Sequence, residues 1–301
     1  MIAVAELLLR RVLRRLYRTS FPVSVRDALA LQRELVQRES VPLPIEPPTA
    51  LRVVVLAPHA DDEVFGCGGA LARAAQQGCE LRVVFMTDGR KGYDASRAGA
   101  DLHAFEHALA ATRKQEARRA GSVLGLGEPV FLDLPDGALS SSPGAADALA
   151  DALRRLSPEI VLLPYFADPH PDHWATVKHF LAAATQAGLP ASLPCWGYEV
   201  WTPLVANAFL DITSVMPLKQ QAMATYQSQV EAVDYPRVVS GLNAYRALAA
   251  GFSAGYAEAF FVDTLAGYTR LFRQTWPHAD RSLRASRRDT HDEIRTMKGA
   301  R

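Results

Sequence analysis

The sequence contains little cysteine and almost no net charge. Its three cysteines, Cys67, Cys79 and Cys195, are too few and too scattered for a disulfide framework or a thiolate zinc site, which favours a reducing compartment. Lys and Arg number 33 against 32 Asp and Glu, a formal net charge of +1, so the overall charge gives no attraction for nucleic acid. We therefore expect a cytoplasmic protein without a nucleic-acid partner.

The N-terminal segment lacks an apolar run long enough to cross a bilayer. It predicts an amphipathic helix over residues 1–17 instead, because apolar residues recur at helical spacing and arginines occupy much of the rest. This helix either packs on the domain or on a second subunit, or it lies on a membrane surface. We therefore keep self-association and peripheral membrane binding as alternative expectations.

From residue 51 onward, strand-like apolar runs alternate with helix-like periodicity, after a proline-rich linker at 41–48. This order predicts an α/β, Rossmann-like three-layer fold with a mostly parallel sheet, plus the N-terminal helical extension. We expect an N-terminal helix and linker at 1–48, one main domain at 49–275 and a charged tail at 276–301. Strands are expected at 51–57, 81–86, 130–132, 160–163 and 195–200, and helices at 62–77, 103–124, 145–156, 173–187 and 218–226.

Two clusters of metal-ligand residues follow predicted strands. The first is Pro58-His59-Ala60-Asp61-Asp62-Glu63 and the second is His170-Pro171-Asp172-His173. Because the carboxyl ends of parallel strands meet at one edge of a sheet, both clusters are expected to form a single site. Gly66-Cys67-Gly68-Gly69, next to the first cluster, is expected to allow close backbone approach rather than to bind a dinucleotide.

A metal site for hydrolysis needs about three His or carboxylate ligands and leaves a position for water. His59, Asp62 and His173 can supply these ligands. The neighbouring Asp61 can then act as general base, and His170 can stabilise an oxyanion or protonate a leaving amine. Zinc suits this donor set best, although iron(II) or another divalent metal would also be accepted.

The two clusters also carry a resemblance to a known family. The first resembles the Pro-His-Pro-Asp-Asp-Glu signature of the PIG-L (LmbE-like) zinc-dependent de-N-acetylases, with Ala60 in place of a proline, and the second matches their other signature. The resemblance extends over about 51–262. It implies removal of acetate from an N-acetylated amino sugar, commonly an N-acetylglucosaminyl conjugate. It also implies that Arg113 and Asp136 hold the sugar, and it supports the roles given above to His59, Asp61, Asp62, His170 and His173.

Several alternatives remain open at this point. Arg113 could form a surface pair with Glu116 instead of contacting substrate, and Asp172 could either support a catalytic side chain or face solvent. A metal-dependent amidase or deacylase acting on a non-sugar substrate would use the same residues, and a non-catalytic carbohydrate-binding protein is a further alternative. Loops at 90–101 and 230–243 are expected to shape the pocket.

Overall fold

The computed structural model describes residues 43–49, 51–93 and 101–275. Contacts group the described residues up to 266 into one compact unit, and residues 267–275 belong to a second unit. The predicted N-terminal helix and the charged tail at 276–301 lie outside the described residues, so both stay predictions. Among the described helices, none is long and apolar enough to cross a membrane.

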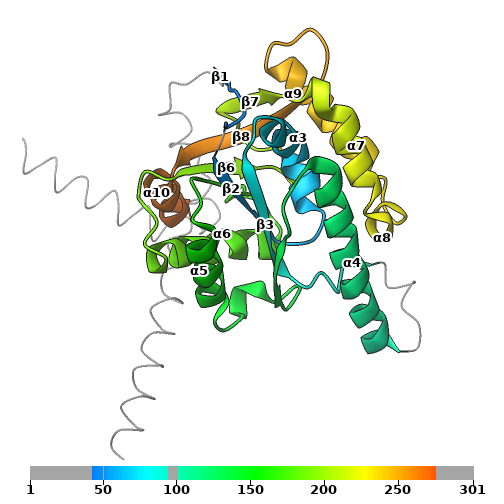
Figure 1. Ribbon diagram of the computed structural model, residues 1–301, viewed down its shortest axis with the longest axis vertical. Helices are drawn as coiled ribbons and strands as arrows, with labels where there is room; N and C mark the ends of the chain where they lie inside the picture. Colours follow the sequence, from blue (N-terminus) through cyan, green and yellow to red (C-terminus); the bar gives the residue numbers. More distant parts are fainter. Residues whose placement is uncertain (1–42, 50, 94–100, 276–301) are drawn as a thin grey trace, which may run out of the picture. The chain divides into compact units, whose positions relative to one another are not determined.

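The larger unit is built on an eight-stranded sheet with the strand order β1-β7-β8-β6-β5-β2-β3-β4 (Figure 1). All strand pairs are parallel except those that β8 forms with β6 and β7. In the central strand β2 every residue but the first is buried, as expected for a strand covered on both faces. The strands are β1 (Leu43–Pro44), β2 (Arg52–Ala57), β3 (Glu80–Thr87), β4 (Val130–Leu134), β5 (Ile160–Pro164), β6 (Pro194–Tyr198), β7 (Ala208–Asp211) and β8 (Ala257–Thr264).

Helices cover both faces of this sheet (Figure 1). Because crossovers between parallel strands are right-handed, α3 and α4, which lead from β2 towards β4, lie on one face, while α5 and α6, which lead back past β2, lie on the other. Helix α7 packs on α3 and α4, and α9 packs on α7 and β8. The helices are α3 (Asp62–Gln76), α4 (Leu102–Leu124), α5 (Ala145–Leu156), α6 (Pro171–Gln186), α7 (Met216–Ala224), α8 (Gln227–Val230), α9 (Tyr235–Ala249) and α10 (Leu265–Thr275), with 3-10 turns at Leu139–Ser141 and Thr213–Val215.

The predicted α/β fold class is confirmed, with differences at the far edge of the sheet. The sequence analysis missed β7 and β8, and it treated 230–243 as a loop where α9 begins at Tyr235. The predicted linker at 41–48 contains β1, whose flanking amides Leu43 N and Ile45 N donate to Asn207 O and Phe209 O at 3.1 and 2.8 Å. Pro44 is tolerated between them because its missing donor would point away from β7, at the sheet edge.

Helix α3 contains a break that the rest of the fold supports. Cys67 has non-helical backbone angles (φ −144°, ψ 18°), and a Cβ on Gly69 would lie 2.6 Å from Ile212 Cγ2. The predicted close approach at the glycine run is therefore present. Glu258 accepts the amide protons of Gly69 and Ala70 at 2.8 and 2.7 Å, and Lys219 Nζ donates to Phe65 O at 3.0 Å.

Lys219→Met is expected to destabilise the protein by about 3–5 kcal/mol, because it leaves the fully buried Glu258 without its charge partner. The free energy of unfolding from denaturant titration measures the effect. Arg154→Met, which breaks an exposed pair with Asp151, is the matched control and should cost less than about 1 kcal/mol. Equal losses in both variants would contradict the structural role of Lys219.

Candidate metal centre and active site

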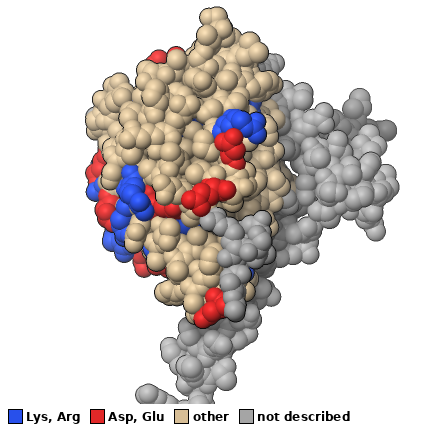
Figure 2. Space-filling model, turned by 90° about the vertical axis from the view of Figure 1, so that its right-hand side faces the viewer, with Lys and Arg blue, Asp and Glu red and all other residues tan. Residues whose placement is uncertain are grey.

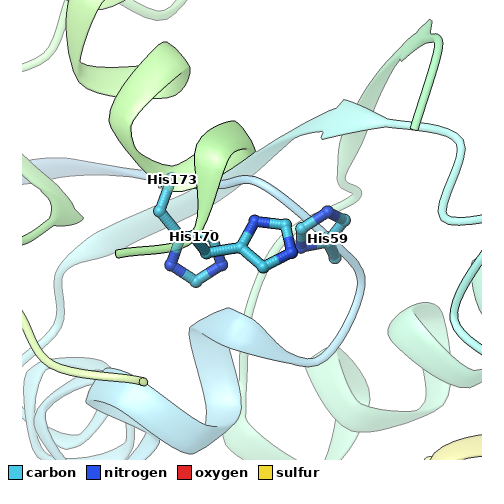
Figure 3. Close-up of side chains that lie close together, drawn as sticks. All are labelled: His59, His170 and His173. Carbon is cyan, nitrogen blue, oxygen red and sulfur yellow. The ribbon is translucent and has the colours of Figure 1, made fainter. Parts of the chain in front are cut away.

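The two predicted clusters meet at the carboxyl edge of the sheet. Strands β2 and β5 are neighbours in parallel register, so the segments that follow them leave the sheet side by side. His59 lies in the turn before α3, and His170 is the N-cap of α6. Figure 3 shows the rings of His59, His170 and His173 close together. The ring centroid of His59 lies 4.9 Å from that of His170 and 5.6 Å from that of His173.

Asp62 lies between two of the imidazoles. Its Oδ2 is 3.1 Å from His59 Nδ1 and 3.2 Å from His173 Nε2. Ligands of a tetrahedral zinc ion, each at about 2.0–2.2 Å from the metal, are separated by roughly 3.4 Å. Asp62 Oδ2 therefore lies at about the spacing of a neighbouring ligand from each of the two rings. The groups whose candidate ligand atoms all lie within 4.8 Å of one another are His59 with His170 and His173, and His59 with Asp136 and Asp172. Asp62 contacts Nδ1 of His59, whereas Nε2 of the same ring faces Asp136 and Asp172.

The chemistry of this cluster fits a divalent cation. Within the described part of the chain, neither ring nitrogen of the fully buried His173 has a hydrogen-bond partner of acceptable geometry. Burial would lower the pKa of this ring, but the charge of Asp62 and the contact with Asp168 raise it to about 9. Buried carboxylates are costly unless a positive charge lies near them, and a metal ion bound between these side chains would provide that charge.

His59 is surrounded in the same way. Its Nε2 lies 3.3 Å from Asp172 Oδ2 and 3.4 Å from Asp136 Oδ1. Burial would lower the pKa of His59, but these two carboxylates and Asp62 raise it well above its usual value. In turn, His59 overcomes the effect of burial on Asp136 and lowers its pKa to about 2. Asp136 therefore faces the centre as a carboxylate.

Asp61 directly precedes α3 in an unusual backbone conformation, with φ 141° and ψ −29°. A positive φ is uncommon outside glycine and is concentrated at functional sites, where the surroundings must hold it. Here Glu63 Oε2 accepts the Asp61 amide at 3.1 Å, and Tyr226 hydrogen-bonds the other oxygen of Glu63. The conformation turns the Asp61 side chain away from that of Asp62, which the sequence analysis required of two adjacent carboxylates with different tasks.

Arg113 holds the other side of Asp61. Its Nη2 donates to Asp61 Oδ2 at 3.0 Å and to Ala60 O at 2.7 Å, and its side chain is buried. The surface pair with Glu116 is not formed, because Glu116 instead accepts from Ser228 Oγ at 2.6 Å. Burial raises the pKa of Asp61 to about 7, although the charge of Arg113 opposes the rise. A carboxylate with such a pKa is suited to accept a proton near neutral pH.

His170 faces the same centre from α6. Its Nδ1 accepts the amide proton of Asp172 at 3.2 Å, and this contact assigns the remaining proton of the neutral ring to Nε2. Burial lowers the pKa of His170, and the charges of His59 and His173 lower it further. The role of His170 as an oxyanion-stabilising or proton-donating group stays a prediction. The Trp201 ring stacks on the His170 ring, with their centroids 6.3 Å apart and an interplanar angle of 18°.

Asp172 is buried and does not face solvent. Its side chain is 1% exposed, and it accepts the amide protons of Gly137 at 2.7 Å and Leu139 at 3.2 Å. It therefore supports His59 from within the protein rather than facing solvent.

The loop 90–101 contributes Lys91 and Gly92 to the pocket, and Lys91 N donates to Asp136 Oδ2 at 2.8 Å.

The sequence analysis missed the site roles of Asp168, Glu63 and Tyr226. Asp168 Oδ2 lies 3.4 Å from His173 Nδ1, and its two oxygens also accept the amides of His170 and Trp201 at 2.9 and 3.1 Å. A carboxylate two residues before the His170 cluster was visible in the sequence. Its partner could not be read there, because the contact with His173 depends on how the loop folds over the first turn of α6.

Asp168→Asn is expected to weaken metal binding by about 10- to 100-fold, because a carboxylate that orients a ligand imidazole also raises its basicity. Zinc and iron(II) affinities of the variant, measured by competition with a chelator, test this expectation. Asp263→Asn is the control, since Asp263 lies on β8 outside the pocket. An unchanged affinity in Asp168→Asn would show that this carboxylate does not act on the metal.

A pocket of about 290 Å³ opens beside this cluster. His59, Asp61 and Asp62 form a polar part of its lining. Apolar side chains from α9, together with Val200 and Trp201 from the segment that follows β6, form another part. The pocket therefore brings the cluster of His and Asp side chains next to an apolar surface.

The fold and this cluster define an α/β protein with a metal-type centre at the carboxyl edge of a parallel sheet. The family model described as PIG-L, GlcNAc-PI de-N-acetylase, matches residues 54–184. The chain belongs to the PIG-L family, as the resemblance of its two signatures predicted.

Three relatives illustrate the range of this family. A diacetylchitobiose deacetylase of Thermococcus kodakarensis is 30% identical over 199 residues, covering 59% of this chain and 70% of that protein. A 4-oxalmesaconate hydratase of Pseudomonas putida is 30% identical over 204 residues, covering 60% and 75%. The crystal structure of the conserved protein TT1542 from Thermus thermophilus superposes with a TM-score of 0.59 at 30% identity, covering 70% of this chain and 93% of that one.

Proposed function

We propose that this protein is a metal-dependent de-N-acetylase that removes acetate from an N-acetylated amino sugar of the N-acetylglucosaminyl type. The observation that carries the proposal is the contact of Asp62 with both His59 and His173, beside a pocket that His59, Asp61 and Asp62 line. The diacetylchitobiose deacetylase among the relatives supports an N-acetylated sugar as the substrate.

His59, Asp62 and His173 would hold the metal, with zinc favoured by the two imidazoles and one carboxylate. When bound, the ion lowers the pKa of a coordinated water to about 7 and polarises the acetamide carbonyl. Iron(II) or another divalent ion would be accepted by the same donors.

Asp61 acts as the general base and takes a proton from the water that attacks the carbonyl carbon. The neutral His170 ring, with its proton on Nε2, donates a hydrogen bond to the oxyanion that develops on the substrate. Asp61 can return this proton to the leaving amine, and His170, which lies in the same pocket, is the alternative donor. Arg113 keeps Asp61 oriented, and together with Asp136 it borders the space for the sugar.

Acetate release from a panel of substrates tests this proposal. The panel contains free, nucleotide-linked and lipid-linked N-acetylamino sugars and N-acetylated amino acids, each assayed with zinc, iron(II) and cobalt. Release from the sugars alone supports the proposal, whereas release from the amino acids alone would favour a non-sugar amidase. Because one relative is a hydratase, an unsaturated dicarboxylic acid is included and followed by its absorbance. Hydration of this acid without any acetate release would overturn the proposal.

A further inference from the structure

The apolar wall of the pocket comes mainly from one face of α9. Tyr235, Val238, Val239 and Leu242 all line the pocket, and their spacing of three, four and seven residues places them on one side of the helix. Trp201 extends the wall from the segment after β6, and its ring meets that of Tyr235 edge-on at 6.3 Å. The wall thus presents aliphatic and aromatic groups to the same pocket that the carboxylates line.

The wall continues out of the pocket onto the surface. Trp201 is 54% exposed and Val238 is 53% exposed, although both line the cavity. Tyr245, one turn beyond Leu242 on the same face of α9, is 60% exposed. On the molecular face drawn in Figure 2, charged side chains form separate groups with larger uncharged areas between them. Contiguous exposed apolar groups at the mouth of a cleft are typical of a ligand-binding surface.

Polar groups next to the wall are already engaged with the protein. Glu199 accepts from Arg246 Nε at 2.9 Å and from the Leu204 amide at 2.9 Å, and Gln229 Nε2 donates to Gly92 O at 3.0 Å. The Glu199–Arg246 pair also ties the Trp201 segment to α9, so the wall is held in place. Hydroxyl groups buried against this surface would have to give up hydrogen bonds to water, which is costly.

We propose that this wall binds an apolar aglycone, an alkyl chain or aromatic ring, that the N-acetylamino sugar carries. This inference rests on the proposed function, and it names the substrate class within it. The acetamido group lies at the His and Asp cluster, and the sugar's substituent runs along α9 towards the surface. A cavity of about 290 Å³ is at the small end of ligand pockets, so the aglycone uses the open wall beyond it.

A series of N-acetylglucosaminides with methyl, butyl and octyl aglycones tests the inference. Full burial of one methylene group strengthens binding about fourfold, and half-burial on an open wall strengthens it about twofold. We therefore expect kcat/KM to rise roughly 100-fold from the methyl to the octyl glycoside. Diacetylchitobiose, whose second unit is a sugar, should gain much less over the methyl glycoside. A gain as large as that of the octyl compound would identify the wall as a sugar subsite and overturn the inference.

Two variants on α9 locate the effect. Val238→Asp is expected to lower the octyl-to-methyl ratio of kcat/KM by about tenfold, because a charge would be placed against the chain. Leu248→Asp is the matched control, since Leu248 is 71% exposed on the same helix but does not line the pocket. It should leave the ratio unchanged. Equal losses in both variants, or a change of oligomeric state in Val238→Asp alone, would overturn the inference.

The same compounds separate this inference from the proposed function. Affinities of the deacetylated octyl and methyl glucosaminides, measured by calorimetry, need no turnover. Tighter binding of the octyl compound, reduced by Val238→Asp, supports the apolar subsite even if no acetate is released. Equal affinities would overturn it even if the methyl glycoside is deacetylated.

Discussion

Asp61→Asn is expected to lower kcat for acetate release by about 10²- to 10⁴-fold while the metal content stays at the wild-type level. Asparagine keeps the size of the side chain and tolerates the positive φ at this position, but it cannot accept the proton of the attacking water. Steady-state kinetics together with metal analysis of the purified protein measure both quantities. Asp151→Asn, on the exposed surface of α5, is the control and should retain full activity.

The pH profile gives a second readout of the same residue. Asp61 must be ionised to act as a base, so activity should fall as the pH drops through its pKa. Burial raises this pKa to about 7, and a cation held beside the carboxylate lowers it, so the acid limb should lie at or below about pH 7. The limb should vanish in Asp61→Asn. Near wild-type activity in this variant, or an unchanged acid limb, would refute the base assignment.

His173→Ala is expected to reduce bound metal from about one ion per chain to near zero and to lower kcat/KM by about three orders of magnitude. The side chain is fully buried and its Nε2 lies 3.2 Å from Asp62 Oδ2, so alanine would remove one of the two imidazoles that contact this carboxylate. Elemental analysis after dialysis measures the metal, and circular dichroism monitors the fold.

His107→Ala is the matched control for this experiment, because His107 lies on the exposed side of α4. Its metal content and activity should equal those of the wild type. Incubation of the wild type with a chelator should abolish activity, and added zinc or iron(II) should restore it. A folded His173→Ala variant that retains one tightly bound ion would show that the metal is held by another group, such as His59, Asp136 and Asp172.

The structure gives Asp61 a more constrained setting than a strand-end position alone implies. Two groups hold it, because Glu63 accepts the hydrogen bond of its amide and Arg113 donates to its carboxylate, and burial raises its pKa to about 7. Tyr226 in turn hydrogen-bonds Glu63, so the segment after α7 contributes to a residue more than 160 positions earlier in the chain. Such constraint is expected where a strained backbone is retained for function.

Local patterns were sufficient for the first half of the domain. The strand at 51–57, the helix after it and the strand at 81–86 each carry a continuous periodic signal, and the structure has these elements within a few residues. The short strand β7 and the antiparallel β8 gave no such signal. They take their place because β6 and β1 offer unpaired edges to them, and a single segment does not encode which edge it will meet.

The residue types of the candidate metal centre could be predicted from the chain, because His59, Asp61 and Asp62 lie within four positions and His170 and His173 within four more. Parallel strand order then predicts that the two groups meet. Only tertiary packing decided the partners of these residues. Arg113 contacts Asp61 rather than Glu116, and Asp168 contacts His173. Helix α9 supplies most of the apolar wall of the pocket. Short-range periodicity reports which face of an element is buried, but not which distant side chain it is buried against.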